Sequence, residues 1–373
     1  MRVGVIVPGF PAAQDAWFLP PIAETQAALQ AYADVHVFAL SYPPHNATHE
    51  WRGVPVQSFG AWKKGAWLPA IITALRREHH RRPFNLLHAY WATEPGLVGA
   101  LAKQSLGVPL LVTSLGGECV GLPRLPYGAQ LRWRWRKLVP YILRRADGVI
   151  CGSTAQSELV KKIAGSANVR PVLLPLGAKL ESALPARTKK SSVRLLAVSA
   201  LLPVKNIGII LEALAQLPST VTLEIVGDGP LRSNLEAKTR ALGLGERVIF
   251  RGWISHEALP EIYANADIFV HASWHEGECF VIEEALAAGL PVVSSRVGIA
   301  ADVVIPGKNG FLFAPDDRQE LTAALRNLLE HPEARRQFGD ASRAFAVEEL
   351  DRARQVEKLF QLYQKIAAHD HSF

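Results

Sequence analysis

The sequence has few cysteines and none of the patterns that use them. Its three cysteines, Cys119, Cys151 and Cys279, lie far apart and form neither a CxxC pair nor a disulfide framework. This usage is typical of a reducing compartment. No uninterrupted apolar run reaches the roughly 18 residues of a membrane-spanning helix, and the apolar run at 3–7 is too short for the core of a signal peptide. These absences predict a cytoplasmic protein.

Tandem repeats and low-complexity tracts are also missing, which excludes solenoids and long disordered tails. The chain has 373 residues, of which 49% are hydrophobic and 20% charged. That length is too great for one ordinary core, so we expect two globular domains.

Acidic residues are outnumbered, and the formal net charge of +7 predicts anionic partners. Candidates are nucleic acid, phosphorylated small molecules and anionic lipid headgroups. Nucleic acid is disfavoured because no recognised binding module is present. One run interleaves basic and indole side chains: Arg132, Trp133, Arg134, Trp135, Arg136 and Lys137. A second contains Trp62, Lys63, Lys64 and Trp67, followed by Arg76, Arg77, Arg81 and Arg82.

These runs support two interpretations. Basic and indole side chains together suit an anionic membrane surface. Alternatively, the runs are solvated helix faces whose tryptophans fill the core. If the first interpretation holds, the protein would be peripheral on the inner face of the cell membrane.

Short apolar segments alternate with stretches long enough for helices, which predicts parallel sheets covered on both faces. In the first half the expected strands are 3–7, 34–39, 84–89, 109–113 and 148–151. A polar stretch at 179–192 interrupts the pattern and is the expected linker. In the second half we expect strands at 193–198, 221–226, 247–251, 267–271 and 291–295, and helices at 206–216, 231–242, 256–264, 280–288 and 317–329. The stretch 350–368 also has a helical pattern. Ligands of such sheets bind at the carboxyl ends of the strands, here in a cleft between two domains.

The most informative segment joins the strand 267–271 to the next helix. Gly277 lies in the turn before this helix, whose first amides and positive dipole end suit a phosphate. Glu276 precedes the turn, and Glu284 lies inside the helix after seven intervening residues. One carboxylate can accept both hydroxyls of a ribose while the other faces a sugar. An ordinary acidic helix face would give the same spacing.

This Glu276–Glu284 segment resembles the E-x7-E signature of the family-4 retaining glycosyltransferases, which have the GT-B fold of two facing Rossmann-like domains. Three further motifs of that family follow one another at similar spacing. Val226–Arg232 resembles its G-D-G-P-x-R turn, 248–267 resembles V-x-F-x-G…L-x-x-x-Y-x-x-A-D, and Gly307–Leu312 resembles G-x-N-G-x-L. The resemblance is dense over 193–315.

The resemblance implies three domain ranges: an amino-terminal acceptor-side domain at 1–178, the linker at 179–192 and a donor-binding domain at 193–350. A carboxyl-terminal helix at about 351–373 would join the first domain. It also implies a UDP-sugar or GDP-sugar donor and a saccharide or lipid-linked acceptor, with a product in cell-envelope glycan or polysaccharide synthesis.

For the donor, the resemblance implies that Lys205 binds the diphosphate, that Glu284 holds the ribose and that Glu276 faces the sugar. No competing anion is adjacent to Lys205 in the sequence. The further donor-site candidates are Gly227, Arg251, Trp253, Ile254, Gly277, Cys279, Phe280 and Val281. No His, Asp or Glu cluster has metal-ligand spacing, so we expect neither a metal ion nor another cofactor.

Several positions depart from the family pattern: Glu118 stands where the family has an aspartate, and the turn at 8–15 has one glycine where the family often has two. Ala200 replaces the arginine that normally joins the lysine on the diphosphate, so one charge-assisted contact is missing or supplied elsewhere. Leu115 replaces a histidine near the transferred sugar. The acceptor-side candidates are Gly116, Gly117, Glu118 and His88. For His88 a structural role is the stronger interpretation, and a polar contact to the acceptor is the alternative.

Retaining glycosyl transfer is therefore the leading hypothesis. The same fold serves sugar-nucleotide epimerases, which need no acceptor. A third hypothesis is a protein that binds a nucleotide-sugar without catalysis, because Ala200 and Leu115 replace two polar residues of the family pattern.

Overall fold

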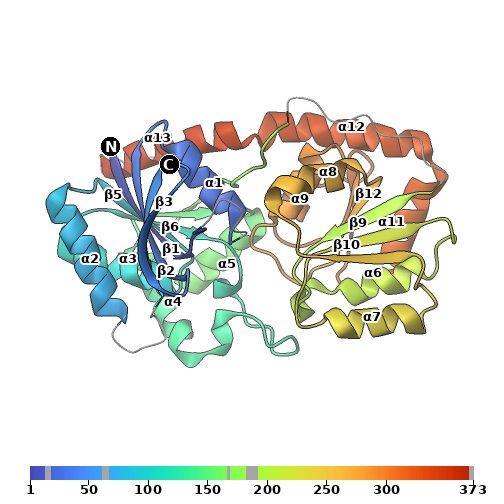
Figure 1. The fold of residues 1–373 in the computed structure, drawn as a ribbon, viewed down its shortest axis with the longest axis horizontal. Helices are drawn as coiled ribbons and strands as arrows, with labels where there is room; N and C mark the ends of the chain where they lie inside the picture. The colour runs from blue at the N-terminus through green and yellow to red at the C-terminus, as the bar shows by residue number, and fades with distance from the viewer. Residues whose placement is uncertain (13–17, 61–66, 166–168, 182–191, 369–373) are drawn as a thin grey trace. The chain divides into compact units, whose positions relative to one another are not determined.

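The computed structural model describes residues 1–12, 18–60, 67–165, 169–181 and 192–368. It divides into two compact units (Figure 1). Unit 1 comprises Met1–Leu176 and Arg352–Phe373, and unit 2 comprises Gly177–Asp351. The predicted linker includes 182–191, and the predicted last helix includes 369–373; both ranges lie outside the described residues.

Unit 1 is built on an eight-stranded sheet in the order β3-β4-β2-β1-β5-β6-β7-β8. Every neighbouring pair is parallel except β3 and β4. The strands are β1 (Arg2–Gly9), β2 (Asp34–Tyr42), β3 (Asn46–Trp51), β4 (Val54–Phe59), β5 (Leu86–Tyr90), β6 (Leu110–Ser114), β7 (Gly148–Cys151) and β8 (Pro171–Leu173). The central strands are apolar and fully buried because helices cover both faces.

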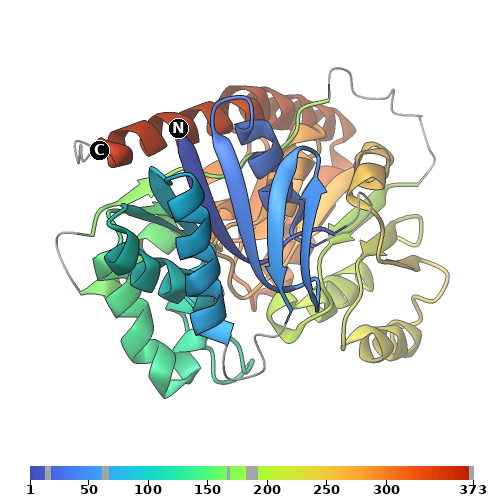
Figure 2. The same cartoon turned by 60° about the vertical axis from the view of Figure 1, so that its left-hand side comes forward.

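Helices of unit 1 pack on the two faces of this sheet (Figure 2). They are α1 (Pro20–Leu29), α2 (Trp67–Arg81), α3 (Glu94–Leu106), α4 (Trp133–Arg145), α5 (Thr154–Ala164) and α13 (Arg352–Ala367), with 3-10 turns at η1 (Gly117–Cys119) and η2 (Ala129–Leu131). Apolar side chains of α2, α3, α4 and α5 form one core with the sheet. The last helix, α13, packs beside α1 within the same unit.

Unit 2 has a six-stranded, wholly parallel sheet in the order β11-β10-β9-β12-β13-β14. The strands are β9 (Arg194–Val198), β10 (Thr222–Val226), β11 (Val248–Gly252), β12 (Ile268–His271), β13 (Val292–Ser295) and β14 (Gly310–Phe313). Strands β10 and β11 are added on one side of β9, and strands β12, β13 and β14 are added on its other side. The loops after β9 and β12 therefore diverge at a topological switch point, where open α/β sheets bind ligands.

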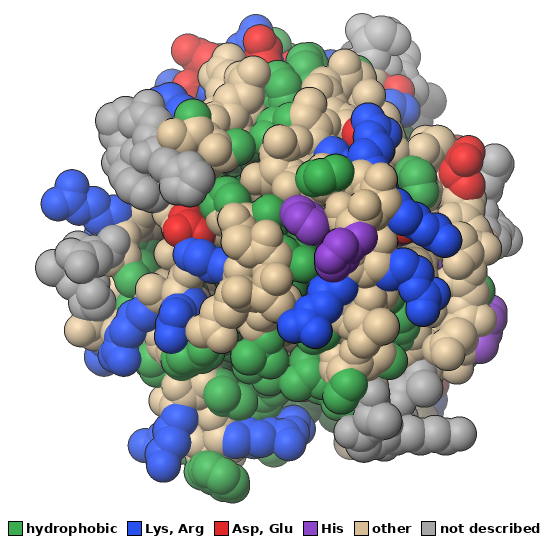
Figure 3. Space-filling model, turned by 90° about the vertical axis from the view of Figure 1, so that its left-hand side faces the viewer, with side chains coloured by type: hydrophobic (Ala, Val, Ile, Leu, Met, Phe, Trp, Pro, Cys, Tyr) green, Lys and Arg blue, Asp and Glu red, His purple; other side chains and the backbone are tan. Residues whose placement is uncertain are grey.

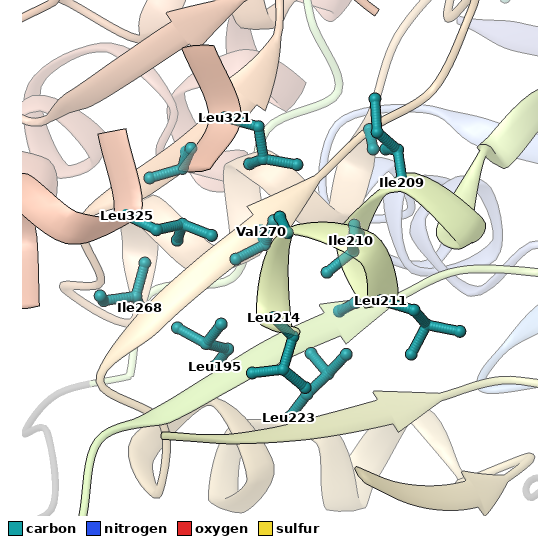
Figure 4. Close-up of a cluster of buried hydrophobic side chains, with 14 of the residues drawn as sticks. Leu195, Ile209, Ile210, Leu211, Leu214, Leu223, Ile268, Val270, Leu321 and Leu325 are labelled. Atoms are coloured by element: carbon teal, nitrogen blue, oxygen red, sulfur yellow. The ribbon is translucent and has the colours of Figure 1, made fainter. Parts of the chain in front are cut away.

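The core of unit 2 lies on both faces of its sheet. The helices are α6 (Ile207–Leu214), α7 (Arg232–Ala241), α8 (Leu259–Ala264), α9 (Phe280–Ala287), α10 (Ala300–Val303), α11 (Arg318–Glu330) and α12 (Pro332–Glu349), with 3-10 turns η3 (Pro203–Lys205) and η4 (His256–Ala258). Figure 4 shows leucines and isoleucines of α6 and α11 meeting β9, β10 and β12. Side chains of α8, α9 and α10 fill the opposite face.

The predicted architecture of two parallel-sheet α/β domains is confirmed. Every expected strand is present within a few residues of its predicted bounds. The hairpin β3–β4 was not predicted, because β3 is an exposed, polar edge strand with no apolar run. Helix α12 was also missed. Among the described residues, no helix is long and apolar enough to cross a membrane.

Candidate active site

The switch point of unit 2 brings together two loops that are far apart in the sequence. One follows β9 and contains η3; the other follows β12 and leads to α9. The two strands are hydrogen-bonded neighbours, so their carboxyl ends meet at one edge. The Trp274 amide donates to the Val204 carbonyl at 2.8 Å, which links the loops directly.

Lys205 and Glu276 form an ion pair across these loops. The Lys205 Nζ lies 2.5 Å from Glu276 Oε1, and both side chains are largely buried. No anion is adjacent to Lys205 in the sequence, but folding brings one to it from 71 residues away. Burial by itself raises the pKa of the Glu276 carboxyl, but Lys205 and His271 together hold it well below its usual range. Glu276 is thus a carboxylate near neutral pH.

Glu276 also accepts hydrogen bonds from its own loop and strand. The Ser273 hydroxyl donates to Glu276 Oε1 at 2.6 Å, and His271 Nε2 lies 3.1 Å from the same oxygen. The Cys279 Sγ lies 3.3 Å from His271 Nε2. Burial raises the pKa of the Cys279 thiol well above its usual range, so it remains protonated. Lys205, Ser273 and His271 thus contact Glu276 Oε1 from three different positions and hold the carboxylate in place.

His271, Glu276 and Cys279 also have the composition of a metal site. One donor atom of each lies within 4.8 Å of the others, and all three are buried. Folding thus brings together three residues whose spacing along the chain matches no recognised metal motif. The Lys205 ammonium on Glu276 opposes a second cation there. The hydrogen bonds just described account for the close approach of these atoms without an ion.

Helix α9 begins at Phe280, as the turn around Gly277 predicts. Cys279 is its N-cap residue and is buried, as is Gly277, while Phe280 and Val281 are half-buried. These four candidate residues therefore lie together at the helix N-terminus, next to Glu276. This end of α9 carries the positive end of the helix dipole.

Glu284 lies one turn further along α9 and is held by two side chains from the neighbouring segment. His256 Nε2 lies 2.8 Å from Glu284 Oε1, and the Tyr263 hydroxyl donates to Glu284 Oε2 at 2.8 Å. Burial, and then the charge of Glu284, raise the pKa of Tyr263 well above its usual range. The carboxylate is therefore oriented by the protein.

The remaining donor-side candidates border the same edge of the sheet. The Gly227 amide donates to the Gly252 carbonyl at 2.8 Å, and a Cβ at Gly227 would lie 2.0 Å from the Ser199 carbonyl oxygen, so only glycine fits. The Arg251 Nε donates to Glu224 Oε1 at 2.8 Å, which turns its guanidinium toward the sheet. Trp253 is 52% exposed, and Ile254 is half-buried.

In unit 1 the Gly116–Glu118 segment follows β6. The Glu118 carboxylate accepts from the Ser114 hydroxyl and from the amides of Leu115 and Gly116 at 2.9–3.1 Å. Burial raises the pKa of Glu118 despite these bonds. A Cβ on Gly117 would lie 2.9 Å from the Tyr127 hydroxyl oxygen. The Glu118 carboxylate therefore stabilises the loop to which it belongs, through hydrogen bonds from Ser114, Leu115 and Gly116.

His88 lies inside β5 and is fully buried. Its Nδ1 lies 2.7 Å from the Tyr363 hydroxyl of α13, and its Nε2 lies 2.6 Å from Thr113 Oγ1. Burial lowers its pKa to about 3, so the ring is neutral. These contacts favour the stronger of the two interpretations, a structural histidine that ties α13 to the sheet.

Four side chains of the site were not identified as site residues from the sequence: His256, Tyr263, His271 and Ser273. Tyr263 belongs to a quoted motif, and His271 ends a parallel strand, where ligand-binding residues are frequent. Its position at the end of a strand could therefore have identified His271 as a site residue. His256 had no such signal, because its contact to Glu284 depends on tertiary packing.

Comparison with known proteins identifies the family. Residues 183–345 match the model of glycosyl transferases group 1, and 21–177 match a glycosyl transferase 4-like domain. The chain belongs to the group 1 glycosyltransferases. It is 30% identical to D-inositol 3-phosphate glycosyltransferase 2 of Catenulispora acidiphila, over 71% of this chain and 68% of the relative.

Further similar proteins include two named enzymes, a sulfoquinovosyl transferase and a sucrose-phosphate synthase. Sulfoquinovosyl transferase SQD2 of Arabidopsis thaliana is 29% identical over 79% of this chain, a match that spans only 62% of the plant enzyme. Sucrose-phosphate synthase from Thermosynechococcus elongatus superimposes with a TM-score of 0.86 at 25% identity, covering 98% of this chain and 99% of that one. HepE of Anabaena, solved with UDP, gives 0.78 at 21% identity, covering 98% and 100%. The group 1 glycosyltransferase is thus a hexosyltransferase-type enzyme with the GT-B fold.

Proposed function

We propose that this glycosyltransferase moves a sugar from a UDP-sugar or GDP-sugar to a saccharide or lipid-linked acceptor, with retention of anomeric configuration, in the synthesis of cell-envelope glycans or polysaccharides. The observation that carries the proposal is the convergence of Lys205, Glu276 and the N-terminus of α9 at the switch point of unit 2. A similar protein, HepE, binds UDP.

The roles follow from the chemistry of the reaction. A diphosphate leaves while the sugar develops positive charge, so catalysis depends on stabilising separated charges. Lys205 and the amides at the start of α9 would bind the departing diphosphate. Glu276, a carboxylate held from three sides, would face the sugar, and Glu284 would bind the ribose hydroxyls. We assign no residue of the described part of the chain as a general base.

The direct test combines donor binding with product analysis. A thermal-shift panel of UDP, GDP and their sugars should raise the melting temperature for one base, because a ligand that binds only the folded state stabilises it. With that donor and a saccharide acceptor, NMR of the product should show the donor's anomeric configuration. Activity should persist in EDTA, since Lys205 and the helix amides carry the phosphate charge in this proposal.

Three results would contradict the proposal in different ways. An inverted product excludes retention. Free epimerised sugar without an acceptor indicates the epimerase alternative. Loss of activity in EDTA that is restored by one divalent cation overturns the expected metal independence.

We also infer that the enzyme works in the cytoplasm and binds an anionic membrane surface through α4 and the residue before it. Trp133 is 75% exposed and is flanked by exposed Arg132, Arg134 and Arg136. Trp135, by contrast, is 4% exposed and fills the core, so the six-residue run is only partly a surface. The Lys137 ammonium lies 5.9 Å from the Trp133 ring centroid.

The second basic run supports the same interpretation only in part. Trp62, Lys63 and Lys64 lie outside the described residues, and Trp67 packs against the core of unit 1. Four arginines of the run remain exposed: Arg76, Arg77, Arg81 and Arg82. On the face drawn in Figure 3, Lys and Arg side chains are spread widely and acidic ones are few. Such a surface complements anionic headgroups.

Vesicle co-sedimentation tests this inference. The protein should pellet with phosphatidylglycerol vesicles at low salt and stay in solution with phosphatidylcholine vesicles. Trp133→Ala should weaken the association about tenfold, because an exposed indole inserts at the interface. Leu242→Ala, which truncates an exposed apolar side chain of unit 2, is the control. Equal pelleting of the protein and Trp133→Ala would contradict the assignment.

A further inference from the structure

His271 is a buried histidine whose place at the end of β12 puts it behind Glu276. It is 4% exposed. Its Nε2 lies 3.1 Å from Glu276 Oε1, and its Nδ1 lies 3.2 Å from Ser294 Oγ on the neighbouring strand β13. Both contacts are within unit 2, and the contact with Ser294 follows from the parallel register of β12 with β13, in which His271 pairs with Ser294.

The hydrogen bonds around His271 indicate which way it donates. The Ser294 hydroxyl already donates its hydrogen to the Ser295 carbonyl at 3.0 Å, and the Ser273 hydroxyl donates to Glu276 at 2.6 Å. Neither hydroxyl therefore has a hydrogen left for the imidazole. His271 Nε2 also lies 3.0 Å from Ser273 Oγ and 3.3 Å from Cys279 Sγ, so Ser273 Oγ is a second possible acceptor beside Glu276. Glu276, as a carboxylate, can only accept. The 3.1 Å contact is satisfied when His271 Nε2 carries a hydrogen and donates it to Glu276 Oε1.

Lys205 has two tasks that compete for its charge. In this structure its ammonium binds Glu276 Oε1 at 2.5 Å, while the proposed function requires it at the donor diphosphate. The arginine that the family pattern places beside this lysine is Ala200 here. Lys205 is therefore the only one of this pair of cations that the chain retains. When the Lys205 ammonium binds the diphosphate instead, Glu276 loses its ion-pair partner.

We propose that His271 is a positioning residue that keeps Glu276 ionised and in place while Lys205 serves the diphosphate. It is suited to this because it cannot follow Lys205: its ring is buried and anchored between β12 and β13. Ser273 helps to orient the carboxylate from the loop that follows β12. The proposal rests on the proposed function of Glu276 as the group that faces the donor sugar.

The test compares two substitutions at this position. His271→Gln retains an N–H donor at a similar reach without the imidazole, and His271→Phe keeps a planar aromatic ring without a donor. For His271→Phe we expect kcat to fall at least tenfold, while the affinity for the free nucleoside diphosphate, measured by calorimetry, changes less than threefold. His271→Gln should recover most of kcat.

The pH profile of kcat supplies a readout that a merely structural role would not move. The groups that face Glu276 are Lys205 from η3, His271 from β12, and Cys279 at the start of α9, whose thiol stays protonated. Lys205 and His271 both lower the pKa of Glu276, so loss of the His271 donor raises that pKa. The acid limb of the profile should therefore move to higher pH in His271→Phe.

Several outcomes overturn the proposal. One is a folded His271→Phe enzyme with unchanged kcat and acid limb. Another is loss of nucleoside diphosphate affinity as large as the loss of kcat, which would indicate general damage to the site. Ser294→Ala, which removes only the anchor at Nδ1, should cost less activity than His271→Phe if the Glu276 contact is the important one. If Glu276→Gln itself retains full activity, the proposed function of Glu276 fails first.

Discussion

Replacing Glu284 with alanine should weaken donor binding at least 100-fold, which corresponds to about 3 kcal/mol. Hydrogen bonds to a charged group contribute about 1.5–3 kcal/mol each, and a carboxylate can accept both ribose hydroxyls. Isothermal titration calorimetry with the nucleoside diphosphate identified by the thermal-shift panel measures the change directly. Glu284→Gln keeps one acceptor oxygen and the shape of the side chain. Its affinity for the nucleoside diphosphate should lie between those of the unmodified enzyme and Glu284→Ala.

The structure requires two controls for this prediction. Glu284 also accepts from His256 and Tyr263, so its removal leaves a buried hydroxyl and a partly buried imidazole without this partner and lowers the free energy of unfolding. Melting curves must show that the variant is folded at the assay temperature. Glu261→Ala, an exposed carboxylate on the nearby helix α8, should leave affinity unchanged.

A ligand without ribose hydroxyls separates binding from stability. A 2′,3′-dideoxy nucleoside diphosphate should bind the unmodified enzyme and Glu284→Ala with similar, weak affinity, because the contact under test is absent from both complexes. Unchanged affinity of Glu284→Ala for the ordinary nucleotide would refute the ribose assignment.

Replacing Lys205 with methionine should lower kcat about 10²–10³-fold, the usual effect of removing one donor that stabilises transition-state charge. The variant should also bind the nucleoside diphosphate more weakly while binding the free nucleoside as before, since only the diphosphate contacts the ammonium. Steady-state kinetics and calorimetry with both ligands test the two parts separately. Lys238→Met is the matched control, since Lys238 pairs with Glu212 on the surface of unit 2.

Lys205→Met carries a second consequence that follows from the ion pair. Lys205 is the first of the groups that offset the effect of burial on Glu276, so its loss raises the pKa of that carboxyl. The acid limb of the pH profile should move to higher pH, in the same direction as for His271→Phe. A Lys205→Met enzyme with normal kcat and an unshifted profile would remove Lys205 from the mechanism.

The sequence by itself determined the alternation of strands and helices, and with it both sheets. Segments such as 109–113 and 267–271 are apolar because helices bury both faces of their sheets, and this requirement is visible in the residues. The start of α9 was also readable, because Gly277 and the helical pattern after it mark a turn into a helix. The edge hairpin β3–β4 was not, since its pairing rather than its composition makes it a strand.

Only the tertiary structure decided how the site's charges are paired. Lys205 and Glu276 are 71 residues apart, and they meet because β9 and β12 are adjacent at the switch point. The same packing gives Glu276 a histidine behind it and gives Glu284 the side chains of His256 and Tyr263. A motif indicates which residue types a site contains. The order of the strands in the sheet decides which of these residues lie close enough to form hydrogen bonds and ion pairs, because electrostatic interactions depend on distance in space rather than along the chain.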